Sequence, residues 1–250
     1  MPFPLSIQNT LDELSRIPYE NLSKIVAFAE TGHKEKALDF QSNWLQKAAD
    51  KGLGGTCFSL TYYLHEQLKA QGHISHFLMG HKIKQKNIHC ALLFTWEMRQ
   101  YLLDPGYMIF APLLLPQQGI ATEQWISPNT VRLEDGPGFW RLFSGNKEQL
   151  KHRFDFPQEP VEETEFIQHW ESSYAFEMMT YPVLNRVTNG VQYYLQKRNL
   201  LIRGNGESQM IRLSEEQWHS AVQNYFGVSD VLASAALGII LKKNKGFFTA

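Results

Sequence analysis

The spacing of apolar residues predicts a chain that begins with helices and continues with strands. Before residue 75, apolar residues recur at helical intervals in two runs. The first run is Leu11, Leu14 and Ile17, and Pro18 ends it. The second run begins with Leu22, Ile25 and Val26. From Ser75 to about Pro116 the pattern becomes short and alternating, with turn residues between the runs. This part of the chain is therefore predicted to form strands.

The remainder is predicted to contain loops, a hairpin and a helix. Residues 117–165 carry scattered Pro, Gly, Trp and Phe among acidic stretches, which predicts long loops between a few strands. Two apolar runs flank Gly204-Asn-Gly206, a pattern typical of a hairpin. Ser214 and Gln217 have the spacing of a capping box, and Trp218 begins the apolar face of the helix that follows.

Composition narrows the function classes. The 250 residues can bury a sizeable core, as one large domain or as two to three small ones. Lys+Arg 24 and Asp+Glu 25 give a net charge of −1, so nucleic acid and anionic membrane surfaces are not expected partners. No apolar run is long enough to cross a bilayer, and the first residues do not have the pattern of a signal peptide. The two cysteines are too few for a disulfide framework of the kind found in secreted proteins. A cytoplasmic location is therefore expected.

Cys57 is a candidate nucleophile. It follows Gly54-Gly55-Thr56 and precedes leucines at helical spacing, which places it in the first turn of a buried helix with Thr56 as the expected N-cap. The helix N-terminus favours a thiolate, and the two glycines would let a substrate carbonyl approach backbone amides that serve as an oxyanion hole. A buried cysteine behind a tight turn is the alternative interpretation.

His89 and Asp104 are predicted to meet on one sheet face. If Glu97 and Met98 form a two-residue hairpin loop, the register places Ala91 opposite Asp104, and His89 shares the face of Ala91. The imidazole and the carboxylate would then be diagonal neighbours within reach of a hydrogen bond. Taken singly, each residue has an ordinary structural interpretation, as a core histidine and as a turn aspartate.

Together the three residues supply a nucleophile, a base and an orienting carboxylate. Their order along the chain differs from that of caspases, and the 32 positions from Cys57 to His89 are too few for a papain-type enzyme. Cys90 points to the opposite face of the strand and is expected to be an inert core residue.

These residues lie in motifs that resemble the arylamine N-acetyltransferase family. Pro18-Tyr-Glu-Asn-Leu22 resembles the family's Pro-Phe-Glu-Asn-Leu, and Leu53-Gly-Gly-Thr-Cys57-Phe58 resembles its Arg-Gly-Gly-x-Cys-Phe. Ile88-His89 is similar to the family's Thr-His, and Leu103-Asp104-Pro-Gly-Tyr107 is similar to its Val-Asp-Val-Gly-Phe. The helix of residues 215–227 also resembles the family's C-terminal pattern. The resemblance extends over nearly the whole chain.

The resemblance implies an α+β fold with an N-terminal helical bundle, a central antiparallel β-barrel and a C-terminal α/β lid. The expected domains are residues 1–75, 76–170 and 171–250. It also implies a ping-pong reaction in which Cys57 takes an acetyl group from acetyl-CoA and passes it to an arylamine or hydrazine. Tyr19 and Tyr107 match family aromatics that line the acceptor pocket.

The chain departs from the family at several motif positions. Leu53 replaces an arginine, which removes the cation that would pair with Glu20 and predicts another partner for this carboxylate. Ile88 replaces a threonine, and Met108 replaces a glycine in the loop after Asp104 that contacts the cofactor.

Three other functions remain open. An amide synthase on the same fold would load a larger acyl chain onto Cys57 from a carrier protein. A transglutaminase-like thiol hydrolase shares the order Cys, His, Asp, and a non-catalytic binding protein would use the same scaffold without the chemistry. A metal site is not expected, because the histidines at positions 65, 73, 76 and 81 lack the spacing of ligand pairs.

Overall fold

The computed structural model describes residues 3–34, 53–117, 119–146, 148–204, 206–244 and 246–248. The chain folds into two compact units. The first comprises Met1–Ser15 and Leu60–His169, and the second comprises Arg16–Ser59 and Trp170–Ala250. The division into three domains at residues 75 and 170 stays a prediction. Across the described residues, no helix has the length and apolar character needed to span a membrane.

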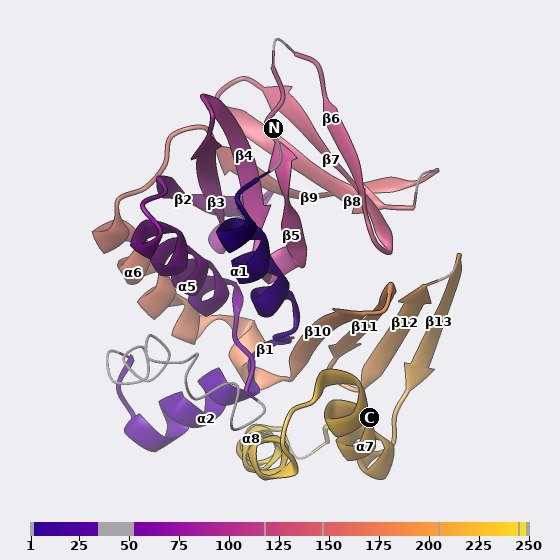
Figure 1. The fold of residues 1–250 in the computed structure, drawn as a ribbon. Coiled ribbons are helices and arrows are strands. Elements are labelled where there is room, and N and C mark those ends of the chain that lie inside the picture. The colour runs from indigo at the N-terminus through magenta and orange to yellow at the C-terminus, as the bar shows by residue number, and fades with distance from the viewer. Residues whose placement is uncertain are drawn as a thin grey trace. The chain divides into compact units, whose positions relative to one another are not determined.

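The first unit is built around an eight-stranded antiparallel sheet (Figure 1). Its strands follow the order β5-β4-β3-β2-β9-β8-β7-β6 and form a nearly closed barrel. Their bounds are β2 Ser75–Lys82, β3 Gln85–Trp96, β4 Arg99–Asp104, β5 Ile109–Leu114, β6 Thr122–Ile126, β7 Asn129–Gly136, β8 Phe139–Gly145 and β9 Leu150–Pro157. A 3-10 turn at Pro105–Tyr107 joins β4 to β5. The expected combination of helices with an antiparallel barrel is thus confirmed.

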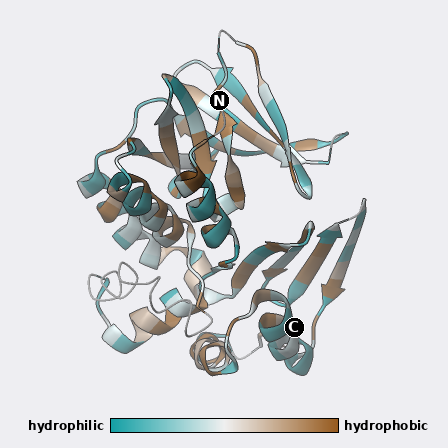
Figure 2. Ribbon diagram, viewed as in Figure 1, coloured by the Kyte–Doolittle hydropathy of each residue, from teal (hydrophilic) through white to brown (hydrophobic). Residues whose placement is uncertain are grey.

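Three helices contribute to this unit: α1 Leu5–Ser15, most of α5 Cys57–Ala70 and most of α6 Glu163–Ser172. The first ends before Ile17, two residues earlier than the apolar spacing suggested, because a residue preceding proline disfavours helical backbone. The barrel interior holds a continuous apolar cluster drawn from the inward positions of the strands, including Leu78, Ala91, Leu133 and Phe156. Figure 2 shows the hydrophobic residues gathered along several strands of both sheets.

The expectation of long loops in residues 117–165 is wrong. This segment forms the four strands β6 to β9, and the turns between them are short. Inward positions are apolar, such as Val131 and Leu142, but the outward positions also carry large residues such as Phe143, so strict alternation is obscured in the sequence. The strands are therefore specified by pairing with their neighbours more than by their own pattern.

The second unit contains a five-stranded antiparallel sheet in the order β1-β10-β11-β12-β13. The bounds are β1 Tyr19–Glu20, β10 Val183–Thr188, β11 Val191–Gln196, β12 Asn199–Gly204 and β13 Glu207–Arg212, with helices α2 Leu22–Thr31, α7 Glu215–Phe226 and α8 Asp230–Lys243. Two 3-10 turns, Ser173–Ala175 and Glu177–Thr180, precede β10. The predicted hairpin is confirmed as the pairing of β12 with β13.

The predicted capping box at the start of α7 is also confirmed. The Ser214 hydroxyl accepts from the Gln217 backbone N–H, and the Gln217 side chain accepts from the Ser214 backbone N–H. Trp218 and Phe226 are buried on the inner face of this helix. The sequence pattern did not separate the last helix, α8, because a run of alanines and leucines follows without helical amphipathicity.

Candidate active site

His89 lies inside the barrel on β3, and its ring is fixed by aromatic neighbours and by Asp104. The imidazole is 5% exposed and stacks on Phe154 at 4.1 Å between ring centroids, with an interplanar angle of 12°. Tyr107 meets the same imidazole edge-on at 6.4 Å. The Nε2 atom lies 2.7 Å from Oδ2 of Asp104. Because this hydrogen bond occupies Nε2, Nδ1 is the ring nitrogen that would face a nucleophile.

The strand register brings this pair together as the sequence predicted. Glu97 and Met98 both have positive φ and form the two-residue loop, and Trp96 pairs with Arg99. The same register continues to Leu92 paired with Leu103. The hairpin and the hydrogen bond between His89 and Asp104 are therefore confirmed, while the catalytic role of the pair stays a prediction.

Asp104 uses both carboxylate oxygens. Its side chain is fully buried, and Oδ1 accepts the backbone N–H of Tyr107 at 2.9 Å while Oδ2 holds His89. The chain then turns through Met108, whose φ of 61° is left-handed. A glycine adopts this backbone more readily, so methionine at this position costs conformational energy. The carboxylate is oriented from two sides before any substrate is present.

Tyr107 is held by a second polar chain that the sequence did not reveal. Its hydroxyl lies 2.9 Å from Oγ of Ser144, and the Arg153 Nε atom donates to the same serine oxygen at 2.9 Å. Arg153 also donates to the Ser144 backbone carbonyl at 3.2 Å. Ser144 belongs to β8, and Arg153 and Phe154 belong to β9. The sequence predicted long loops in this region, so none of the three was predicted as a site residue.

Gly80 provides the space that the imidazole needs. It pairs with His89 across β2 and β3. A Cβ atom at Gly80 would lie 3.0 Å from Cβ of His89 and 3.1 Å from the Phe156 ring, which is tighter than ordinary contact. A larger residue opposite the histidine would therefore have to displace the His89 or Phe156 side chain by a few tenths of an ångström, and no motif in the sequence pointed to this glycine.

Cys57 begins helix α5, as predicted, and is 5% exposed. The expected cap is wrong, because the buried Thr56 hydroxyl has no hydrogen-bond partner within the described part of the chain. The segment before the helix is instead fastened to β1. The Glu20 backbone N–H donates to the Gly55 carbonyl at 2.9 Å, and the Gly55 N–H donates to the Pro18 carbonyl at 3.2 Å.

The backbone amides of both glycines in this segment are already hydrogen-bonded within the chain. The Gly54 N–H donates to Oε1 of Glu20 at 3.0 Å, and the Gly55 N–H is committed to Pro18. A Cβ atom at Gly54 would lie 2.3 Å from the Pro18 carbonyl oxygen, so close backbone packing requires this glycine. An oxyanion hole formed by other backbone amides near these glycines stays a prediction.

Glu20 has the replacement partners that the loss of the family arginine predicted. Its fully buried carboxylate accepts the Ser23 backbone N–H at 2.9 Å, the Ser23 hydroxyl at 2.5 Å and the Gly54 N–H. Desolvation is the dominant effect and raises the pKa of Glu20 above its usual value, while these hydrogen bonds oppose the shift. The carboxylate thereby ties β1 to the segment that carries Cys57.

The predicted residues fall in both units. His89, Asp104 and Tyr107 belong to the first unit, whereas Cys57 and Tyr19 belong to the second. Tyr19 pairs with Asn185 of β10 and forms a parallel bridge with Gly55. The structure therefore brings His89, Asp104 and Tyr107 together, and the approach of Cys57 to them is part of the proposal below.

Two other sequence predictions concern cysteine and metal chemistry. Cys90 is buried on the strand face opposite His89, together with Leu92 and Phe94, and neither cysteine forms a disulfide. Among the residues that the structure describes, no three His, Cys, Asp or Glu side chains gather as ligands for a metal ion.

Comparison with known proteins gives a family and a fold. A family model described as N-acetyltransferase matches residues 8–233. No curated protein matches the sequence at a significant level. The fold is similar to that of arylamine N-acetyltransferase from Salmonella typhimurium, with a TM-score of 0.72, 18% identity, and coverage of 95% of this chain and 94% of that one.

Two further solved structures have the same fold. The Mycobacterium marinum arylamine N-acetyltransferase in complex with CoA is 20% identical, with a TM-score of 0.72 and coverage of 94% and 92% of the two chains. A Bacillus cereus arylamine N-acetyltransferase described as having a Cys-His-Glu triad is 19% identical, with a TM-score of 0.69 and coverage of 89% and 90%.

Proposed function

The chain belongs to the N-acetyltransferase family, and we propose that it moves an acetyl group from acetyl-CoA, through a thioester on Cys57, to the nitrogen of an arylamine or hydrazine. The observation that supports this reaction is the buried hydrogen bond of 2.7 Å between His89 and Asp104. A cysteine at the start of a helix is the matching nucleophile.

The first half-reaction loads the enzyme. His89 removes the proton from Cys57, and the thiolate attacks the acetyl carbonyl. The new bond joins the Cys57 sulfur to the acetyl carbon, and the bond from that carbon to the CoA sulfur breaks. His89 returns the proton to the departing CoA thiolate. Asp104 keeps the imidazole in the tautomer that places the reactive lone pair on Nδ1.

The second half-reaction transfers the acetyl group from Cys57 to the amine. The amine nitrogen attacks the thioester carbon, a C–N bond forms, and the bond to the Cys57 sulfur breaks. His89 takes the proton that the amine loses and returns it to the Cys57 sulfur. Tyr107, held at the edge of the His89 ring, and Tyr19, beside the Cys57 segment, are proposed to line the acceptor site.

The donor and acceptor are supported by the fold comparisons. The Mycobacterium marinum protein was solved with CoA, and the similar structures are described as arylamine N-acetyltransferases. The Bacillus cereus protein is described with glutamate as third member of its triad. The present chain has Asp104 in contact with its histidine, so the proposed triad is Cys57, His89 and Asp104. A cytoplasmic location stays a prediction.

Steady-state kinetics with two substrates test the proposal. Acetyl transfer from acetyl-CoA to an arylamine should give the parallel double-reciprocal lines of a ping-pong reaction. Cys57→Ala should abolish the transfer, and Cys90→Ala, a matched change at the other buried cysteine, should retain it. Loss of activity only in the Cys90 variant would contradict the assignment. Transfer from a carrier-bound or larger thioester, with none from acetyl-CoA, would favour an amide synthase instead.

A further inference from the structure

The strand that carries His89 is interrupted immediately before it. On β2 and β3, Gly80 pairs with His89, and the next pair is Lys82 with Gln85. A single residue of β2, His81, therefore opposes three residues of β3, numbered 86–88. A bulge of this kind bends the strand and re-aims the side chains beside it.

Asn87 is the middle residue of the bulge and has left-handed backbone, with φ of 55°. This conformation costs energy for any residue with a side chain, although asparagine tolerates it better than most. His89 follows two positions later and is the first residue to return to the ladder with Gly80. The backbone that leads from Asn87 to His89 therefore lies between the bulge and the first residue of the regular ladder.

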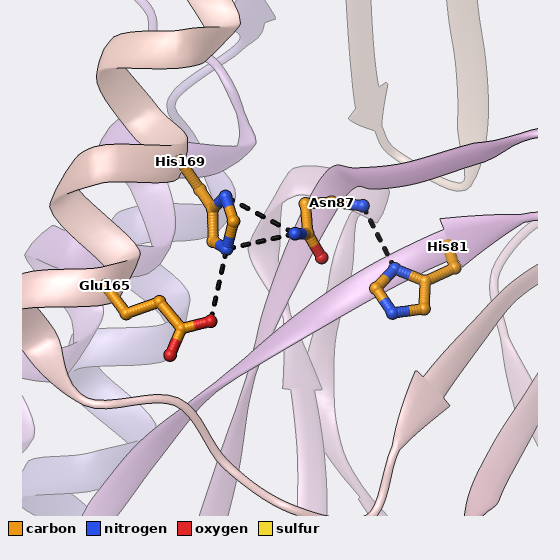
Figure 3. Close-up of polar contacts among 4 residues, drawn as sticks. All are labelled: His81, Asn87, Glu165 and His169. Atoms are coloured by element: carbon orange, nitrogen blue, oxygen red, sulfur yellow. Dashed lines mark hydrogen bonds and ion pairs between the residues drawn. The ribbon is translucent and has the colours of Figure 1, made fainter.

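Side chains from two other elements hold Asn87 in this conformation (Figure 3). Its backbone N–H, which the bulge removes from the ladder, donates to Nδ1 of His81 at 3.0 Å. Its side-chain amide lies 3.0 Å from Nε2 of His169 on α6. Glu165, one turn earlier on the same helix, lies 3.4 Å from that histidine nitrogen.

His81 accepts the Asn87 backbone N–H only when its Nδ1 carries no proton. Nε2 of His169 can accept the Asn87 amide N–H or donate to Glu165, but not both at once, so these two contacts are alternatives. Burial lowers the pKa of His81, which favours its neutral form near neutral pH. All four residues in Figure 3 belong to the first unit, as do His89 and Asp104. The contacts of Asn87 therefore link β2, β3 and α6 at a point two residues before His89, the proposed base.

We propose that Asn87 is a positioning residue for His89, and that its hydrogen bonds to His81 and His169 hold the bulge that aims the imidazole at Cys57. This inference rests on the proposed function. Asn87 itself touches no reacting atom; its effect is transmitted through the two backbone units that separate it from His89. Misplacement of a catalytic group by about 1 Å can slow a reaction by as much as ~100-fold.

The test compares Asn87→Ala with a matched substitution far along the chain. Asn189, at the turn between β10 and β11 in the second unit, has the same left-handed backbone, with φ of 51°. Asn189→Ala therefore imposes a similar conformational cost without touching the bulge. Asn87→Gly forms a third variant, which keeps the left-handed backbone and loses only the side-chain contact to His169.

Two readouts are measured for each variant, together with the melting temperature. The first is the rate constant for acetylation of Cys57 by acetyl-CoA in a single turnover. The second is the pH dependence of Cys57 alkylation by iodoacetamide, followed by peptide mass mapping, which reports whether a base acts on the thiol without any acetyl donor. Asn87→Ala should slow acetylation by ~10- to 100-fold and move the alkylation profile to higher pH.

Asn87→Gly should recover part of the acetylation rate, and Asn189→Ala should match the wild type in both readouts even if its melting temperature falls as far. Wild-type acetylation and alkylation profiles in Asn87→Ala would overturn the inference, as would equal losses in Asn87→Ala and Asn189→Ala. If acetyl-CoA does not label the wild-type protein, the proposed function fails, and the alkylation profiles alone decide the role of Asn87.

Discussion

The buried carboxylate of Glu20 gives a prediction with a definite sign. Protonated Glu20 can keep its hydrogen bonds to Ser23 and Gly54, because the Ser23 hydroxyl can accept from a carboxylic acid as well as donate to a carboxylate. Desolvation then raises the pKa of Glu20 above its ordinary value of 4.5. The folded chain therefore holds a proton that the unfolded chain releases, over the pH range just above 4.5.

This linkage determines how stability changes with pH. Over that range the folded state binds more protons than the unfolded state, so the contribution of Glu20 to the unfolding free energy falls as pH rises. The fall approaches about 1.4 kcal/mol per pH unit between the unfolded and folded pKa values and stops above the folded value. The contribution is fully present below the unfolded pKa.

Glu20→Gln removes the titratable carboxyl group and leaves one buried backbone N–H without an acceptor. An amide has one acceptor oxygen, so its NH₂ group must face either the Ser23 or the Gly54 backbone N–H. A buried donor left without a partner costs about 1–3 kcal/mol. We expect the variant to be less stable than the wild type by about this amount near pH 4.5, with the difference shrinking as pH rises.

Urea unfolding followed by tryptophan fluorescence between pH 4.5 and 8 measures this difference directly. Glu207→Gln on the exposed strand β13 is the matched control, and its effect should stay within about 0.5 kcal/mol at every pH. A difference between wild type and Glu20→Gln that is constant over this pH range, or that grows as pH rises, would refute the reasoning.

Three further substitutions address the site. Asp104→Asn should leave the fold intact and slow acetylation of the nucleophile by up to ~10⁴-fold, because the imidazole loses its tautomer control; a near wild-type single-turnover rate would remove the aspartate from the mechanism. Gly80→Ala should displace the His89 ring and slow acetylation of Cys57 by about 10-fold or more; an unchanged acetylation rate would contradict this expectation. Ser144→Ala should raise the KM for the amine while leaving acetylation by acetyl-CoA unchanged, because it releases the Tyr107 hydroxyl; an unchanged amine KM would separate this contact from acceptor binding.

Features of the fold and the site can be predicted from the sequence where they depend on residues that lie close together in the chain. The two-residue loop at Glu97 and Met98 fixes the register, and the register alone predicts that His89 and Asp104 share a face. The Ser214 capping box is equally local, since its donors and acceptors lie within four residues. Such interactions depend on neighbours in the chain and leave a visible pattern.

The rest depends on contacts between distant segments. Phe154 stacks on His89 from β9, and its place beside the histidine depends on the pairing of β9 with β8 and β2, which no local sequence pattern specifies. Glu20 meets Gly54 across 34 positions, and Asn87 meets His169 across 82. No periodicity links such residues, because their partners are chosen by tertiary packing.

The central claim is that Cys57 carries the acetyl group between donor and acceptor. Brief exposure to acetyl-CoA, rapid acid quenching and intact mass measurement should show a single acetyl adduct, which peptide mapping places on Cys57 and which disappears when an arylamine is added before the quench. An adduct on Cys90, or an adduct on Cys57 that persists in the presence of the amine, would contradict the account.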